Sequence, residues 1–184
     1  LTVLLSIFFL LSLSTYTPED PNFIFPENTK IQNLFGFYGS VISDLILQSF
    51  GIISFLFCIT IFFTGILIIR YKKLENILSN LFYSVIYIVS GSTIVSAYKD
   101  DSFWLIINGN GGFVGRSIKE FIYSFNGSVN QNIIFFLLLS LTIIFFLLSI
   151  QFSIKTFFRL IKSVLFFVMK FFSLKLNSFL IIYI

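Results

Sequence analysis

The fold class is decided by residues 133–150, which read IIFFLLLSLTIIFFLLSI and contain no charged residue. A helix that crosses a bilayer needs about 20 predominantly apolar residues. Fifteen of the residues in this run are large and apolar, and together they favour insertion by roughly 5–9 kcal/mol, at about 0.3–0.6 kcal/mol each. We therefore predict a transmembrane helix over residues 132–151.

Three earlier apolar runs predict further crossings, at about residues 1–14, 45–69 and 77–98. The first has no charge, but at ~1.5 Å per residue it spans only about 21 Å, less than the ~30 Å hydrocarbon core. Because the sequence begins with Leu1, we expect preceding residues to complete this helix. A cleaved signal peptide is the alternative, although no basic segment or cleavage site is visible.

Composition supports the same fold class. Of the 184 residues, 57% are hydrophobic and 11% are charged, whereas a soluble domain carries about 25% charged residues. The sequence thus excludes an ordinary soluble globule. It predicts an all-α integral membrane bundle of four transmembrane helices over residues 1–151, solvated by lipid.

The same composition excludes several kinds of active site. There is no histidine, and Cys58 is the single cysteine, so neither a Ser-His-Asp triad nor a zinc cluster can form. No nucleotide-binding loop of the form G-x-x-x-x-G-K-[ST] occurs. We predict no catalytic, cofactor-binding or metal-binding residues, and therefore a chain that is not an enzyme by itself.

Charge asymmetry predicts the topology, because cytoplasmic loops collect Lys and Arg. Residues 70–75 hold three cations, and the residues after 150 hold five cations and no acid. The loop 15–44 is mostly acidic, and the loop 99–131 is balanced. We therefore expect these two loops outside and both termini in the cytoplasm. The net charge of +4 would then face anionic lipid, with no nucleic acid bound.

The basic segment 152–184 predicts an amphipathic helix in the inner interface. Lys155, Arg159, Lys162 and Lys170 gather on one side at 100° per residue, opposite Val164, Phe167 and Phe171. A fifth crossing over residues 164–184 is the alternative, but it would bring Lys170 and Lys175 near the bilayer centre at a cost of a few kcal/mol each.

Small residues recur at four-residue spacings that let helices approach closely. The pairs are Gly36 with Ser40, Gly39 with Ser43, and Ser92 with Ser96. They favour packing within the bundle, and contacts between copies in a homo-oligomer are the alternative. In the second outer loop, Gly111, Gly112 and Gly115 predict a tight turn that leads into a short amphipathic helix at residues 117–122.

The first outer loop carries the most specific pattern. Residues 15–23, TYTPEDPNF, end the first helix with two prolines. Residues 33–44 then read NLFGFYGSVISD and lead into the second crossing. We expect Asp44 at the outer boundary, where it caps or hydrogen-bonds a neighbouring helix. The absence of charge within the crossings of residues 45–69, 77–98 and 132–151 argues against ion transport.

This order of motifs resembles the N-terminal four-helix membrane region of the FtsK/SpoIIIE DNA translocases, and the resemblance covers roughly residues 4–150. It implies a membrane anchor that places a translocase at the division septum of the bacterial inner membrane and contacts other division proteins. The linker and ATP-driven motor of that family do not follow within these 184 residues. The candidate partner or structural residues are Tyr16, Pro18, Asp20, Pro21, Gly36, Gly39, Asp44, Gly111, Gly112 and Gly115.

Other interpretations remain open from the residues alone. Each candidate residue also fits ordinary helix termination and packing. The composition is compatible with an accessory membrane subunit of a respiratory complex, or with a small multi-pass transporter. The lack of histidine and of charge at membrane depth weakens both.

Overall fold

A computed structural model describes residues 1–22, 30–71, 77–98, 105, 107–125, 131–152 and 162. This part of the chain is helical and contains no strand, which confirms the predicted all-α class. The helices are α1 (Thr2–Ser14), α2 (Gly36–Phe50), the 3-10 turn η1 (Gly51–Ile53), α3 (Ser54–Tyr71), α4 (Ile77–Tyr98), α5 (Gly112–Phe125) and α6 (Gln131–Ser149).

The chain divides into two compact units, Leu1–Ile150 and Gln151–Ile184. The first unit contains all of these helices. The predicted amphipathic helix at residues 152–184, and the alternative crossing at 164–184, lie almost entirely outside the described residues.

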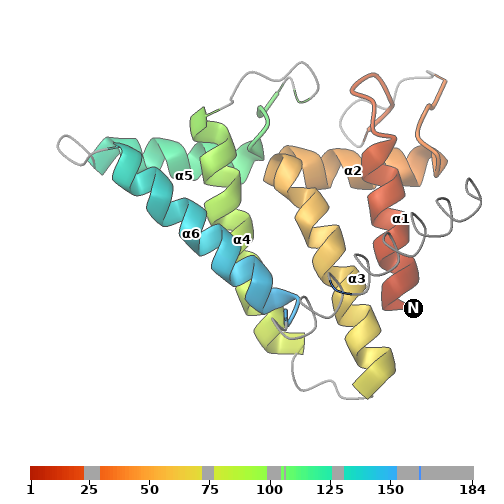
Figure 1. Ribbon diagram of the computed structural model, residues 1–184. Coiled ribbons are helices and arrows are strands. Elements are labelled where there is room, and N and C mark those ends of the chain that lie inside the picture. Colours follow the sequence, from red (N-terminus) through yellow and green to blue (C-terminus); the bar gives the residue numbers. More distant parts are fainter. Residues whose placement is uncertain are drawn as a thin grey trace, which may run out of the picture. The chain divides into compact units, whose positions relative to one another are not determined.

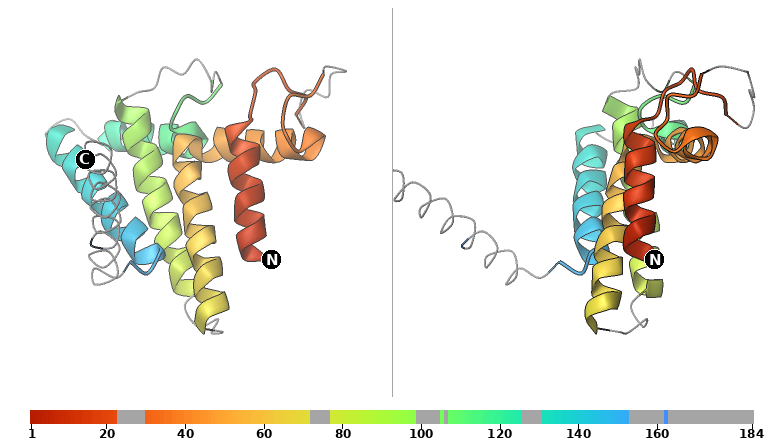
Figure 2. Two further views of the ribbon diagram at one scale, coloured as in Figure 1. Left: turned by 45° about the vertical axis from the view of Figure 1, so that its right-hand side comes forward. Right: turned by 90° about the vertical axis from the view of Figure 1, so that its right-hand side faces the viewer.

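Within the first unit, α1 packs against α3, and α4 packs against α5 and α6. The contact between α3 and α4 joins these two groups. Helices α2 and α5 lie across one end of the others, roughly perpendicular to α3 and α4 (Figures 1 and 2). The described residues of the two predicted outer loops lie at this same end (Figure 1).

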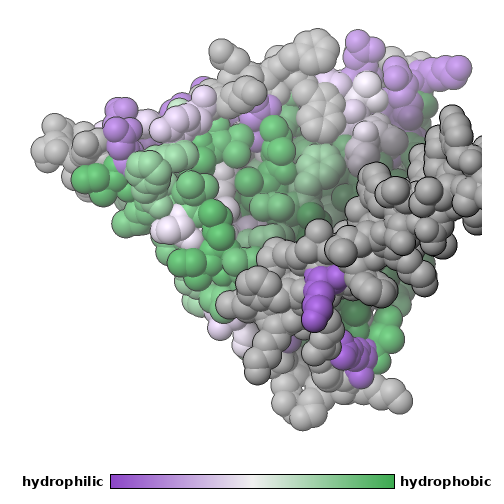
Figure 3. Space-filling view, viewed as in Figure 1, coloured by the Kyte–Doolittle hydropathy of each residue, from purple (hydrophilic) through white to green (hydrophobic). Residues whose placement is uncertain are grey.

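The distribution of side chains is the reverse of that in a soluble protein. Large apolar side chains are exposed on the long helices, such as Phe82 at 62%, Phe136 at 66% and Leu137 at 55%. Apolar residues cover the exposed flanks of α4 and α6, whereas polar residues gather near α2 and α5 (Figure 3). An apolar surface of this extent needs lipid around it, so the protein is embedded in a membrane.

The interior between the helices is rich in small hydroxyl side chains. Thr60 on α3 lies 2.9 Å from the Tyr87 hydroxyl on α4 and 3.1 Å from the Ser149 hydroxyl on α6. Thr142 on α6 donates to the hydroxyl of Ser90 on α4 at 2.9 Å. Such hydrogen bonds hold helices together where the surrounding solvent offers no competing partner.

Three stretches of the described chain are long and apolar enough to cross a membrane: Gly36–Arg70, Ile77–Tyr98 and Gln131–Ser149. Helix α1 is apolar but shorter, so its crossing stays a prediction. Helix α4 matches the predicted range 77–98.

The predicted second crossing differs from the observed helices. Residues 45–50 belong to α2, and α3 begins at Ser54. The chain bends at Gly51, whose φ is +64°, and the backbone N–H of Ile52 donates to the carbonyl oxygen of Asn110 at 2.9 Å. The predicted helix over residues 45–69 is therefore wrong at its start, because a glycine with positive φ separates α2 from α3.

Candidate functional site

The carboxylate of Asp20 organises the first outer loop. Asp20 is only 5% exposed. Its Oδ1 accepts the backbone N–H of Gln32 at 2.8 Å, and its Oδ2 accepts that of Asn33 at 2.9 Å. Hydrogen bonds to an ionised acceptor are stronger than neutral ones. Asp20 therefore holds the segment that precedes α2 against the end of α1.

Asn33 extends this contact to both helices. Its Nδ2 donates to the carbonyl oxygen of Ser12 at 2.9 Å and lies 3.4 Å from the hydroxyl of Ser43 on α2. Its Oδ1 accepts the N–H of Phe35 at 3.1 Å. A Cβ atom at Gly39 would overlap Asn33 Oδ1 and lie 2.7 Å from the Cβ of Phe35. The missing side chain at Gly39 thus makes room for Asn33.

Tyr16 and Asp44 meet, although 28 positions separate them in the sequence. The Tyr16 hydroxyl donates to Asp44 Oδ1 at 2.9 Å, and Gln48 Nε2 lies 3.4 Å from both groups. Asn108 of the second outer loop donates to Gln48 Oε1 at 3.1 Å. Burial, and then the charge of Asp44, raises the pKa of Tyr16. Asp44 was expected to hydrogen-bond a neighbouring helix, whereas its partner Tyr16 lies just after the end of α1.

We refer to Tyr16, Asp20, Asn33, Asp44 and Gln48 as the outer-loop cluster. It joins the end of α1, the chain before α2, α2 itself and, through Asn108, the second outer loop.

The two prolines have different surroundings. Pro18 is exposed and lies in a turn in which the N–H of Asp20 donates to the carbonyl oxygen of Thr17 at 3.2 Å. This is the second position of a turn, where proline is favoured. Pro21 is buried, and its carbonyl oxygen accepts the hydroxyl of Ser40 at 2.8 Å.

Gly36 has a role that differs from the expected close packing. Its φ is +62°, and within the described part of the chain no atom lies within 4 Å of the place a Cβ would occupy. Gly36 therefore allows the positive φ at the start of α2. Gly39 instead allows Asn33 and Phe35 to lie close to the α2 backbone.

The second outer loop meets the end of α2 and the backbone of α4 at several glycines. We refer to Gly51, Gly111, Gly112, Gly115 and Ser92 as the glycine junction. A Cβ at Gly115 would overlap the carbonyl oxygen of Ser92 on α4, and one at Gly51 would overlap that of Asn110. The Ser92 hydroxyl donates to the carbonyl oxygen of Phe50 at 2.8 Å. The start of α5 thus meets α4 backbone against backbone, and the end of α2 meets the chain around Asn110 and Gly112 in the same way. The predicted helix at 117–122 lies within α5.

The described residues contain no group of three or more His, Cys, Asp or Glu side chains that could hold a metal ion. The end of the molecule that carries α2 and α5 exposes several large apolar side chains. Leu34 is 62% exposed, Tyr38 77% and Phe113 62%. Sequence reasoning selected mainly buried residues, whose motifs are distinctive. Leu34, Tyr38 and Phe113 are not among its candidates, because an exposed apolar side chain in an apolar sequence carries no distinguishing signal.

Comparison with known proteins identifies the family. The family model described as the 4TM region of DNA translocase FtsK/SpoIIIE matches residues 1–162. The chain belongs to the FtsK/SpoIIIE family. This confirms the resemblance inferred from the loop motifs, and it assigns the matched residues to the 4TM region.

Several FtsK relatives are similar to this chain. DNA translocase FtsK of Rhizobium meliloti is 28% identical over 117 residues, which is 64% of this chain and 13% of that protein. DNA translocase FtsK of Rickettsia prowazekii is 28% identical over 144 residues, 77% of this chain and 18% of that protein. The chain thus spans less than a fifth of the length of these FtsK relatives. No solved structure matches it.

Proposed function

We propose that this chain is the membrane anchor of a cell-division DNA translocase and that its outer loops direct the translocase to the division septum. Four crossings would hold it in the bacterial inner membrane, with both termini in the cytoplasm. At the septum, the outer loops would contact other division proteins, and the chain would touch no nucleic acid. ATP hydrolysis would belong to a motor outside these residues.

The observation that supports this proposal most strongly is the combination of an apolar, lipid-facing surface with a fixed outer end. Exposed Leu, Ile and Phe side chains cover the long helices. The outer-loop cluster and the glycine junction tie both outer loops to α2 and α4. Anchoring needs the first feature, and recognition by a protein partner needs a preorganised surface such as the second.

The test separates anchoring from recruitment. A fluorescent fusion of the chain is expressed in dividing bacteria, and both its membrane fraction and its enrichment at septa are measured. The double substitution Pro18→Ala with Glu19→Ala alters exposed residues of the first loop while leaving Asp20 in place. We expect at least a twofold loss of septal enrichment and an unchanged membrane fraction.

Glu120→Ala is the matched control, because Glu120 is an exposed acid on α5 outside the first loop. If the double variant is enriched at septa as strongly as the parent chain, recruitment through the first loop is wrong. If the parent chain is extracted from membranes by alkaline carbonate, anchoring itself is wrong.

A further inference from the structure

A pocket of about 270 Å³ opens where the end of α4, the middle of α5 and the start of α6 meet. Its polar wall includes Tyr98, Lys119, Tyr123 and Asn132. No carboxylate is among the described residues that line it. The pocket is separate from the outer-loop cluster and from the glycine junction.

Lys119 gives this pocket a fixed positive charge. Its Nζ donates to the backbone carbonyl oxygen of Ser96 at 2.9 Å, which holds the ammonium group beside α4. The next residue, Glu120, forms an ion pair with Arg116, in which Arg116 Nε lies 3.3 Å from Glu120 Oε1. Among the described residues, Lys119 lines the pocket and Glu120 does not.

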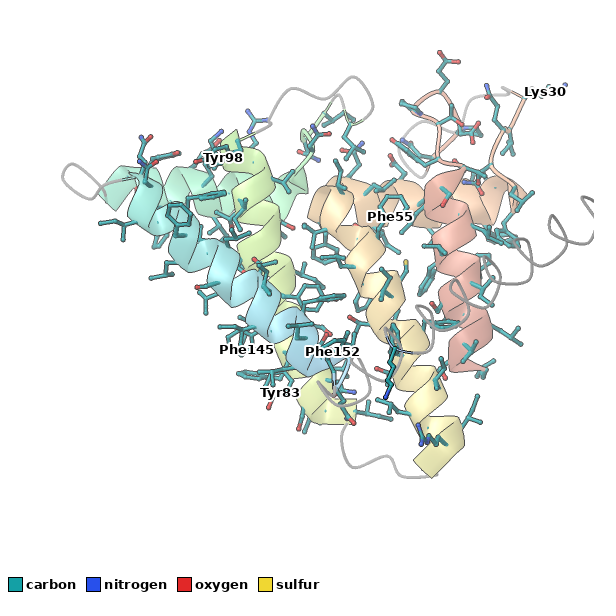
Figure 4. The ribbon with its side chains drawn as sticks, viewed as in Figure 1. Lys30, Phe55, Tyr83, Tyr98, Phe145 and Phe152 are labelled. Carbon is teal, nitrogen blue, oxygen red and sulfur yellow. The ribbon has the colours of Figure 1, made fainter. Side chains whose placement is uncertain are left out.

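The rest of the pocket is apolar and continues toward the lipid-facing surface. Ile94, Ile134 and Leu138 form part of its lining. The ring of Tyr98 lies against that of Phe135, with centroids 4.3 Å apart, and the end of α4 that carries Tyr98 lies close to α6 (Figure 4). Phe136 and Leu137 are exposed on α6 beside it. Tyrosine is typical of the membrane–water interface.

We propose that this pocket binds an anionic phospholipid, with the headgroup phosphate at Lys119 and the first part of an acyl chain against Ile134 and Leu138. Pockets that bury a whole small ligand measure about 300–1,000 Å³. A somewhat smaller pocket with one cationic and one apolar wall suits part of a larger molecule, whose remaining chain lies along α6.

The experiment measures lipid binding to the delipidated 184-residue chain in detergent by native mass spectrometry. Phosphatidylglycerol, phosphatidylcholine and inorganic phosphate are the three probes. We expect phosphatidylglycerol to bind best. Lys119→Met is expected to weaken its binding about fivefold, the effect of one cation near an anionic headgroup, with little change for phosphatidylcholine. Arg116→Met removes an exposed cation of the same helix and should leave binding unchanged.

A second variant tests the pocket without changing its charge. Ala97 lines the pocket and is exposed, so Ala97→Trp should fill the space and weaken phosphatidylglycerol binding while Lys119 remains. Circular dichroism checks that each variant keeps its helices.

Three results would overturn the proposal. In the first, Lys119→Met and Ala97→Trp both bind phosphatidylglycerol like the parent chain. In the second, Arg116→Met loses as much binding as Lys119→Met, which would indicate a diffuse surface charge. In the third, inorganic phosphate displaces the lipid at equal concentration, which would indicate a site for a free anion. None of these depends on septal recruitment.

Discussion

At the scale of single residues, Asp20 shows how a candidate position of the first outer loop stabilises the fold. Asp20 is buried, and both of its oxygens accept backbone N–H groups from the returning chain. The proline motif and Asp44 could be found in the sequence. Asn33 could not be distinguished, because its partners Ser12 and Ser43 are 21 and 10 positions away and only the fold brings them together.

Replacing Asp20 with asparagine should destabilise the loop. An asparagine carbonyl can accept one of the two N–H groups, but its amide would face the other donor. We expect a loss of about 1.5–3 kcal/mol in the free energy of unfolding, the range for a hydrogen bond to a charged group. Denaturant titration in detergent measures it. Glu19→Gln changes the exposed neighbour and should stay within about 0.5 kcal/mol of the parent; equal losses in both variants would contradict the assigned role.

Gly36 and Gly39 should respond differently to the same substitution, asparagine. At Gly36 the requirement is a φ of +62°, and asparagine adopts the left-handed region more readily than most residues. At Gly39 any Cβ meets Asn33 and Phe35, and such overpacking costs about 1–3 kcal/mol. Gly36→Asn should therefore melt close to the parent chain, and Gly39→Asn well below it. The reverse order of melting temperatures would refute this distinction.

The buried hydroxyl of Tyr16 predicts a loss of stability at alkaline pH. Its pKa is raised in the folded chain by burial and by Asp44, so the fold favours the neutral phenol. The stabilisation is complete below the ordinary tyrosine pKa of about 10 and is lost as the pH rises above it toward the folded value. We expect the free energy of unfolding to fall more steeply above pH ~10 in the parent than in Tyr16→Phe. Parallel pH profiles of the two chains would contradict the prediction.

At the scale of helices, the sequence predicted where the long helices lie, but it placed the start of the helix predicted at residues 45–69 wrongly. Helix α4 covers the predicted 77–98, and α6 ends within two residues of the predicted 151. The break at Gly51 was missed because residues 45–69 are apolar on both sides of it. The backbone bends there to meet Asn110, 58 positions after Ile52. Hydrophobicity locates a membrane segment, but it does not locate a bend that depends on such a distant partner.

The glycine junction gives a test at this scale. A methyl group at Gly115 would overlap the backbone of Ser92, which cannot move without displacing α4. A methyl group at Gly91 would meet only side-chain ends, at 3.0 Å from Ile53 Cδ1 and 3.1 Å from Thr142 Cγ2. We expect Gly115→Ala to cost about 1–3 kcal/mol.

In Gly91→Ala, the gain in helix propensity of about 1 kcal/mol should offset the crowding. Thermal unfolding in detergent, followed by circular dichroism, compares the two variants. If Gly91→Ala is the less stable one, the backbone contact at Gly115 does not control the packing of α5 on α4.

At the scale of the whole molecule, the reversed distribution of side chains is what the sequence could predict most securely. Low charge and long apolar runs required lipid outside. The structure adds that hydroxyl residues of α4, such as Ser84, Ser90 and Thr93, are buried. The basic segments at residues 70–75 and after residue 150 also predicted that both termini lie in the cytoplasm. The orientation depends on how cations distribute across the membrane during insertion.

The predicted topology is best tested by labelling single cysteines with a maleimide that does not cross membranes. Cys58 is the single native cysteine and is 1% exposed, so Cys58→Ser provides the background. Glu19→Cys should be labelled in intact spheroplasts, because the acidic loop is expected outside. Lys73→Cys and Lys155→Cys should be labelled only after permeabilisation, because they lie in basic segments.

Leu1→Cys then decides whether α1 crosses. Helix α1 has 13 residues and spans only about 20 Å, so it must rely on local thinning of the bilayer or on further residues to reach the far side. If it crosses, Leu1→Cys and Glu19→Cys react from opposite faces. Labelling of both from outside would leave three crossings, and with Lys155 still inside it would place the termini on opposite sides of the membrane.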